Sequence, residues 1–236
     1  MAFRSATTNS QTSGVGTITV GLPTGVVAGD IILVCLSAFS ATSGTTMSDT
    51  PDGFTQVLQQ YLNGASPSQW YTCLFWKVAT GSEPGTYTFT NSSGSMIGCI
   101  QCRAYSGRSS TQFSATSTGA DTFTTYTSGY AVSGTGLTAA TGDDVVIFYT
   151  LVEGGAQTYS FTTPTGFANP VLAQNTSTGT MDPIFGADNV NVVAGATGVI
   201  ATTPSSTVDT AGHVSSFTVA ITQGSASAAL MGQACL

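Results

Sequence analysis

Charged side chains are scarce in this sequence. They make up 6% of the 236 residues, with four Lys plus Arg against eleven Asp plus Glu and a formal net charge of −7, whereas about a quarter of residues are charged in average soluble domains. Phosphate groups are neutralised by Lys and Arg in number. The basic residues here form no cluster: Arg4, Lys77, Arg103 and Arg108. We therefore expect neither nucleic acid nor an anionic membrane surface as a partner.

Long apolar runs are also missing. No stretch approaches the ~18 consecutive apolar residues that span a membrane, and residues 1–14 lack the apolar segment of a secretory signal. We therefore expect synthesis in a reducing compartment, where cysteines are normally free thiols. The cysteines are odd in number, which agrees with buried, unpaired side chains: Cys35, Cys73, Cys99, Cys102 and Cys235.

Motifs for catalysis or metal binding are absent too. The only histidine is His213 and no G-x-S-x-G segment occurs, which excludes the usual serine-hydrolase arrangement. Cys99 and Cys102 have a zinc-like spacing, but they lie in an apolar segment that reads as a strand, where residues i and i+3 point to opposite faces. The only glutamates, Glu83 and Glu153, lie in different parts of the chain. We expect no enzyme, no cofactor and no metal site.

The sequence is instead rich in patterns of period two. Residues 16–22 (GTITVGL) and 215–222 (SSFTVAIT) alternate apolar and polar side chains, as half-buried strands do. Residues 30–39 and 144–152 are continuous apolar runs, typical of central strands covered on both faces. Abundant Gly and Thr disfavour helices. The expected fold is all-β, an antiparallel two-layer β-sandwich that is jelly-roll-like in its number of strands.

Two phrases occur twice, which suggests an internal pseudo-duplication. Gly29-Asp30 returns as Gly142-Asp143, and TPDGF at 50–54 returns as TPTGF at 163–167, both 113 residues later. Two interpretations are open. The two halves either close one sandwich together, which we prefer because each half offers about five strands, or form two sandwiches of ~110 residues each.

The expected organisation follows from this repeat. A single sandwich domain at 15–223 consists of similar halves at 15–107 and 130–223, joined by a long surface connection at 108–129. An N-terminal arm at 1–14 precedes the domain. The apolar, uncharged segment 224–236 is expected to dock on its own sandwich or on a neighbouring subunit.

The strand at 70–78 (WYTCLFWKV) is apolar on both faces. Trp70, Leu74 and Trp76 form the expected core face, so Tyr71 and Phe75 on the other face need a cover. The cover is the 108–129 connection, another subunit or a ligand, since exposed apolar patches usually mark interfaces. The candidate interface residues are Tyr71, Phe75, Phe113, Phe123, Tyr126, Leu230, Met231 and Leu236.

Four segments carry a resemblance to a known family. They are LPTGVVAGDIILVCLSAF at 22–39, PDGFTQVL at 51–58, LFWKVATGSEPGTYTFT at 74–90 and CRAYSG at 102–107. Together they resemble a β-sandwich module of phage virion structural proteins, over about residues 16–107 and more loosely in the second half. The resemblance implies capsid decoration, fibre or tail components, and supplies no catalytic residues.

The expected function is therefore non-enzymatic. The resemblance implies a phage capsid decoration (cement) protein that is made in the host cytoplasm and then binds the outer surface of the head shell and stabilises it. Its expected partners are the major capsid protein or other virion proteins, together with further copies of itself in a homo-oligomer. The alternative is a receptor- or glycan-binding module of a tail fibre or spike.

Overall fold

A computed structural model shows an all-β chain in which every regular element among the described residues is a strand. The described residues are 3–40, 47–49, 51, 53–63, 69–106, 108–120, 124–125, 132–153, 158–175, 183–190, 192–205 and 211–223. All strand pairs are antiparallel. The prediction of an all-β antiparallel sandwich is confirmed.

The first half of the chain forms one large and one small sheet. The large sheet has the order β1 (Phe3–Val15), β8 (Met96–Tyr105), β3 (Ile31–Ser40), β6 (Gln69–Val78) and β5 (Thr55–Asn63). The small sheet has the order β2 (Thr17–Gly21), β7 (Thr86–Asn91) and β4 (Met47–Asp49). The run after the first Gly-Asp pair is thus the central strand β3, as the sequence predicts.

The second half forms a second large sheet and three short pairs. The large sheet has the order β10 (Thr124–Thr125), β20 (Ala211–Gln223), β13 (Asp144–Glu153), β16 (Ile184–Asn189) and β15 (Ala168–Ala173), and β9 (Arg108–Ala120) also pairs with β20. The short pairs are β11 (Val132–Gly134) with β18 (Ile200–Thr202), β12 (Thr138–Ala139) with β17 (Gly195–Ala196), and β14 (Ser160–Phe161) with β19 (Pro204–Ser205). The run after the second Gly-Asp pair is the central strand β13.

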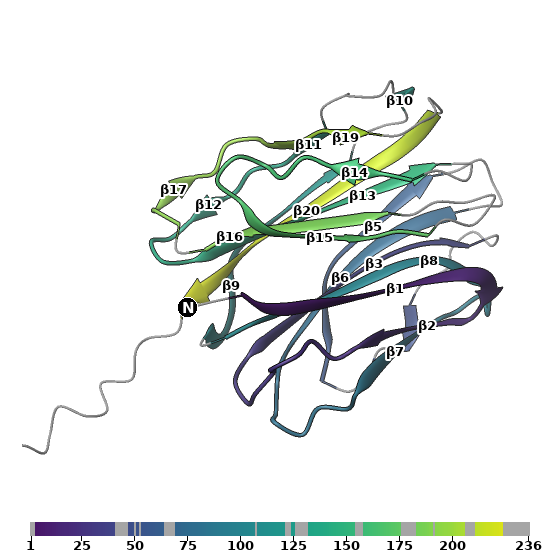
Figure 1. Cartoon of the computed structure of the whole chain (residues 1–236), viewed down its shortest axis with the longest axis horizontal. Helices are drawn as coiled ribbons and strands as arrows, with labels where there is room; N and C mark the ends of the chain where they lie inside the picture. The colour runs from purple at the N-terminus through teal and green to yellow at the C-terminus, as the bar shows by residue number, and fades with distance from the viewer. Residues whose placement is uncertain are drawn as a thin grey trace, which may run out of the picture.

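The sheets stack in four layers, with the two large sheets face to face in the middle (Figure 1). A first core lies between the first large sheet and β2–β7, and includes Ile18, Phe75 and Phe89. A second core lies between the second large sheet and the short pairs, and includes Ile147. A third lies between the two large sheets, where Leu33 is buried. Both large sheets are therefore covered on both faces, which explains the unbroken apolar runs.

This layering differs from the preferred expectation that both halves close one core. Each half has its own core, since the first half alone supplies β1 to β8 rather than about five strands. Two further expectations differ from the structure. Residues 3–14 are not a free arm but belong to β1, paired with β8. Residues 108–120 of the expected connection form strand β9, whose Ser/Thr-rich sequence has no apolar alternation.

The first Gly-Asp pair closes a turn that feeds β3. Gly29 has φ +86°, a left-handed conformation that glycine adopts without a Cβ penalty. The Asp30 carboxylate accepts the N–H of Val27 at 2.8 Å. The Gly29 N–H donates to the Ala79 carbonyl, and the Ala79 N–H donates to the Asp30 carbonyl, both at 2.8 Å. A side-chain cap of this kind satisfies backbone donors in a tight turn.

The second Gly-Asp pair makes the same turn before β13. Gly142 has φ +87°, and the Asp143 carboxylate accepts the N–H of Ala140 at 2.9 Å. Gly142 and Asp143 exchange the two equivalent backbone hydrogen bonds with Val192, both 2.9 Å. The Gly-Asp pair occurs twice in the sequence because each central strand begins after the same type of turn.

Replacing Gly29 by Ala is expected to cost about 1–2 kcal/mol of the free energy of unfolding, because a left-handed φ brings a Cβ too close to the following carbonyl. A Cβ at Gly29 would meet no other atom within 4 Å, so the cost is that of the backbone conformation alone. Gly85→Ala is the control, since Gly85 has equally open space and no positive φ. Urea denaturation should show a loss for Gly29→Ala only, and equal losses in both variants would contradict the assignment.

Candidate functional site

The two large sheets pack face to face around a buried apolar cluster, and we call this contact the central interface. It buries apolar side chains from both halves: Ile31, Leu33, Cys35, Leu74, Cys99, Tyr105, Val146, Phe148, Ala173, Ile184, Phe217, Val219 and Ile221. These side chains lose their contact with water only when the two halves pack together. Their burial therefore opposes separation of the halves.

An ion pair is completely buried at this interface. Arg103 Nη2 lies 2.5 Å from Asp188 Oδ1, and neither side chain is exposed. Arg103 comes from β8 in the first half and Asp188 from β16 in the second. Asn169 Nδ2 also donates to Asp188, at 3.0 Å. The pair therefore joins the two halves through charges that water does not reach.

Every donor nitrogen of the Arg103 guanidinium has a partner. Nε donates to Tyr105 Oη at 2.8 Å. Nη1 donates to the Gly186 carbonyl at 3.1 Å and more weakly to Gln101 Oε1 at 3.4 Å, and Nη2 also donates to the Asn169 carbonyl at 2.9 Å. Complete satisfaction of this kind is what makes a buried guanidinium tolerable.

The backbone around this site is shaped for close approach. Among the described residues, Asn169 is the one non-glycine residue with positive φ, at 50°, and its carbonyl accepts a hydrogen bond from Arg103. At Gly186 a Cβ would lie 2.2 Å from Gln101 Oε1, so a side chain there would have to displace this amide oxygen from Arg103 Nη1. Gln101 itself donates across the interface to the Val171 carbonyl at 3.0 Å.

A second polar contact lies elsewhere on the same interface. The hydroxyls of Thr72, Thr150 and Ser215 lie within 3.3 Å of one another. Thr72 belongs to the first half and the other two to the second. Because one hydroxyl can donate and accept at once, the three satisfy one another away from water and add directional contacts to an otherwise apolar face.

Tyr71 and Phe75 do not form an exposed interface, which corrects the sequence-based expectation. Both are fully buried in the first core, where β2 and β7 cover them. Phe113 on β9 is partly buried, and its ring packs edge-on against Trp76 at 5.5 Å between centroids. The cover of the Tyr71 face is therefore a sheet of the same chain. The other five candidates, Phe123, Tyr126, Leu230, Met231 and Leu236, lie outside the described residues.

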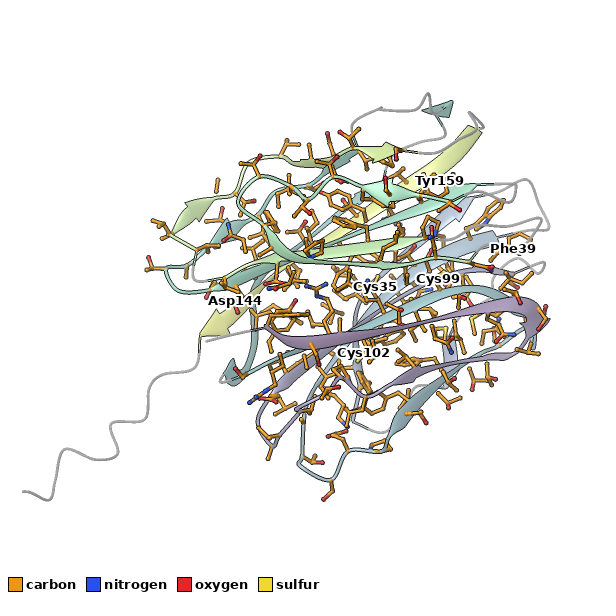
Figure 2. The ribbon with its side chains drawn as sticks, viewed as in Figure 1. Cys35, Phe39, Cys99, Cys102, Asp144 and Tyr159 are labelled. Atoms are coloured by element: carbon orange, nitrogen blue, oxygen red, sulfur yellow. The ribbon has the colours of Figure 1, made fainter. Side chains whose placement is uncertain are left out.

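Four cysteines are buried: Cys35, Cys73, Cys99 and Cys102. Figure 2 shows Cys35, Cys99 and Cys102 inside the molecule. Cys99 belongs to the central interface and Cys102 to the first core, which confirms that this pair points to opposite faces of its strand. Burial raises the pKa of the Cys73 and Cys102 thiols. These thiols are therefore unsuited to act as nucleophiles or metal ligands.

An outer groove of the first half holds a second ion pair. It lies beside the turn at 51–54 and has a volume of about 480 Å³. Lys77 Nζ lies 2.7 Å from Glu83 Oε2 and also sits over the rings of Phe54 and Tyr87, 5.4 and 5.6 Å from their centroids. Tyr87 Oη donates to the same carboxylate oxygen at 2.7 Å. The groove is therefore occupied by charges that neutralise one another.

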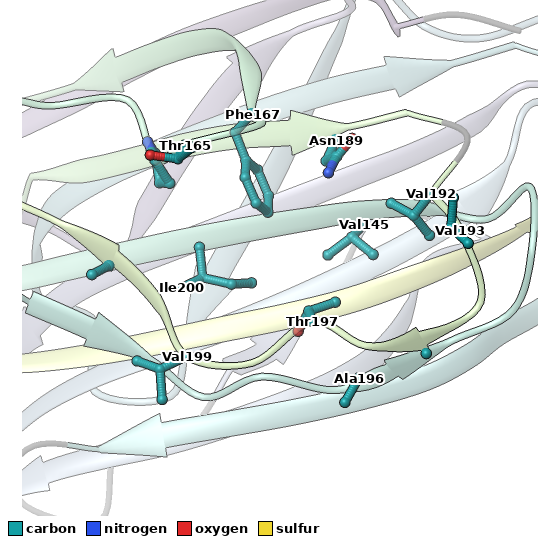
Figure 3. Close-up of a pocket in the computed structure, with 13 residues that line it drawn as sticks. Val145, Thr165, Phe167, Asn189, Val192, Val193, Ala196, Thr197, Val199 and Ile200 are labelled. Carbon is teal, nitrogen blue, oxygen red and sulfur yellow. The ribbon is translucent and has the colours of Figure 1, made fainter.

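The second half has a corresponding groove beside the turn at 164–167, with a volume of about 570 Å³, and we call it the second-half groove (Figure 3). In the first half, a Cβ on the turn glycine Gly53 would lie 3.5 Å from the Lys77 side chain. In the second half, a Cβ on the corresponding Gly166 would lie 3.6 Å from the Asn189 side chain. An uncharged amide thus stands where the first half has a cation. The lining contains no charged residue, and its apolar side chains include Val145, Phe167, Val192, Val193, Val199 and Ile200.

Within the described part of the chain, no group of three His, Cys, Asp or Glu side chains is placed to hold a metal ion. None of the described residues belongs to a helix long and apolar enough to cross a membrane. Comparisons of the chain with models of protein families, with curated proteins and with solved structures found no match. The resemblance to phage virion modules therefore stays a prediction.

The Glu83 pair makes stability depend on pH. Burial by itself raises the pKa of Glu83, but hydrogen bonds from Lys77, the Thr80 N–H and Tyr87 outweigh it and lower the pKa to about 2. Unfolded Glu83 takes up a proton near pH 4.5. The contribution is therefore complete above about pH 4.5 and is lost as the pH falls to about 2.

We expect Glu83→Gln to lower the free energy of unfolding at pH 6, and the difference from wild type to shrink towards pH 2, because the wild-type carboxylate is then protonated. Urea denaturation at pH 6, 4, 3 and 2 measures this. Ser82→Ala, a neutral change on the same exposed turn, is the control and should show a constant difference. A Glu83→Gln difference that is equally large at pH 2 and pH 6 would rule out the assigned role.

Proposed function

We propose that this chain is a non-enzymatic structural protein of a phage virion, and that it binds the outer surface of the head shell as a decoration protein. The observation that carries the proposal is where the charges lie. Three of the four basic residues are in ion pairs inside the chain: Arg4 with Asp30, Lys77 with Glu83 and Arg103 with Asp188. Basic side chains that are paired within the chain stabilise the fold, and few basic side chains remain to act on a substrate.

The layered architecture supports the same role. Three successive cores make a thick, rigid body in which both large sheets are protected on their faces. A particle outside the cell gains from such a body, because apolar sheet faces left in water promote association with other molecules. The two halves carry equivalent Gly-Asp turns and large sheets with corresponding strand orders, and we interpret them as an internal duplication that doubled the stack.

The outer edge of β5 is the contact surface that we propose for the shell or for a neighbouring copy. β5 lies at the end of the first large sheet, and its nine residues include neither charge nor proline. Natural edge strands usually carry such residues to prevent pairing. Both edge strands have a register shift, β5 between Gln56 and Leu58 and the matching strand β15 between Ala168 and Val171, but only β15 also carries a proline, Pro170, and a positive-φ residue, Asn169. β5 is therefore the better template for an added strand.

The glycan-binding alternative depends on exposed aromatic side chains. Among the described residues, the large apolar side chains that are exposed include one aromatic, Tyr61 at 40%, and the others are valines. Tyr71 and Phe75, the aromatic side chains that the sequence analysis named as candidate interface residues, are buried. This favours a protein partner over a sugar platform, and binding of the purified chain to a glycan array would reverse that preference.

The test is to mix the purified chain with undecorated phage shells and to measure bound copies after sedimentation. Wild type should bind at micromolar concentration. Tyr61→Lys should weaken binding by at least about tenfold, because a charge on an edge strand opposes pairing. Val27→Lys is the matched control, since Val27 is similarly exposed, at 50%, and lies on a turn away from β5.

No wild-type binding to shells at micromolar concentration would refute the decoration role. Binding that Tyr61→Lys leaves unchanged would keep the role and refute the β5 edge as its contact surface. Both variants should unfold at the wild-type urea concentration, because each replaces an exposed side chain.

A further inference from the structure

The second-half groove leaves apolar side chains in water. Val193 is 84% exposed and Val199 71% exposed, the highest values among the large apolar side chains of the described residues. Figure 3 shows both at the rim, with Phe167 and Ile200 inside and Val145 beneath them. In the first half the corresponding groove contains the Lys77–Glu83 pair. The two halves thus differ at this place, and the second lacks a charged occupant of its own.

The described chain ends near this groove and continues into a segment with several apolar residues. The described residues end at Gln223, the last residue of β20, and thirteen further residues follow, GSASAALMGQACL. Ile221 near the end of β20 pairs with Asp144, whose neighbour Val145 lines the groove. The segment therefore starts at the end of the sheet where the groove lies. Fully extended, thirteen residues reach about 45 Å.

The segment and the groove both lack charged side chains, and both carry apolar ones. Residues 224–236 contain no charged side chain, and their large side chains are Leu230, Met231, Gln233 and Leu236. The groove lining contains no charged residue either. A segment attached to the same chain has an effective concentration in the millimolar range, so burial of two or three apolar side chains suffices to hold it.

We propose that the second-half groove binds the C-terminal segment 224–236 of its own chain, with the apolar side chains Leu230, Met231 and Leu236 against Phe167, Val193 and Val199. The proposal gives the exposed valines a cover and gives the segment a defined place. It is independent of the shell-binding role, because it concerns a contact within one chain.

The experiment uses the native Cys235 as a probe. Val193→Cys places a thiol at the rim of the groove, and oxidised glutathione supplies the oxidant for a disulfide with Cys235. The four other thiols are buried. Val15→Cys is the matched control: Val15 is also exposed, at 42%, but pairs with Met96 at the opposite end of β1 from Phe3 and Tyr105. Mass spectrometry after proteolysis identifies the cross-link, and non-reducing gels separate monomer from dimer.

We expect the intramolecular disulfide to form at least about tenfold faster in Val193→Cys than in Val15→Cys. Adding Leu230→Asp and Met231→Asp to Val193→Cys should remove that advantage, because charged side chains resist burial in an apolar groove. Equal rates in the two cysteine variants would overturn the proposal. Cross-linking found only in dimers would also overturn it, and would identify the occupant as the segment of a second copy.

Discussion

The buried guanidinium of Arg103 is the interaction on which the arrangement of the two halves depends. A charge removed from water costs several kcal/mol unless a counter-charge and hydrogen bonds replace the lost hydration. The second half supplies the Asp188 carboxylate and the carbonyls of Asn169 and Gly186. Since these groups satisfy Arg103 only in one alignment, the ion pair fixes how the second large sheet sits on the first. Apolar packing alone is less directional.

The alignment of the two large sheets determines which surfaces of each half face outward. With the central interface closed, each large sheet has one face left, and each is covered by strands of its own half. The outer grooves then lie beside equivalent turns, at 51–54 and 164–167. One groove holds Lys77 and Glu83, and the lining of the other contains no charged residue. Two halves with equivalent turns thus present different surfaces to a partner.

The strands could be predicted from the sequence because their patterns are local. Alternation at 16–22 and the apolar run at 30–39 correspond to β2 and β3, and the doubled Gly-Asp phrase marks two real turns. Strand geometry alone placed Cys99 and Cys102 on opposite faces. Local patterns also explain the failures. Strand β9 has no apolar alternation, so its pairing with β20 depends on the partner and not on its own residues.

The central interface could not be predicted, because periodicity shows that a face is buried but not what buries it. Tyr71 and Phe75 read as an uncovered face, although β2 and β7 cover them. One signal was present. Gln101 and Arg103 interrupt an apolar strand, MIGCIQCRAY, and two polar residues on one buried face require polar partners. Those partners lie 66 to 85 residues further along the chain, beyond the range of any local pattern.

The most direct measurement is equilibrium unfolding in urea followed by two probes. Both tryptophans, Trp70 and Trp76, lie on β6 in the first half, so their fluorescence reports that half, whereas far-ultraviolet circular dichroism reports both. We expect coincident transitions in wild type. In Arg103→Ala we expect the free energy of unfolding to fall by about 3–5 kcal/mol, because Asp188 is left buried without its counter-charge. A wild-type protein with two separate transitions, or an Arg103→Ala variant as stable as wild type, would contradict this role of the Arg103–Asp188 pair.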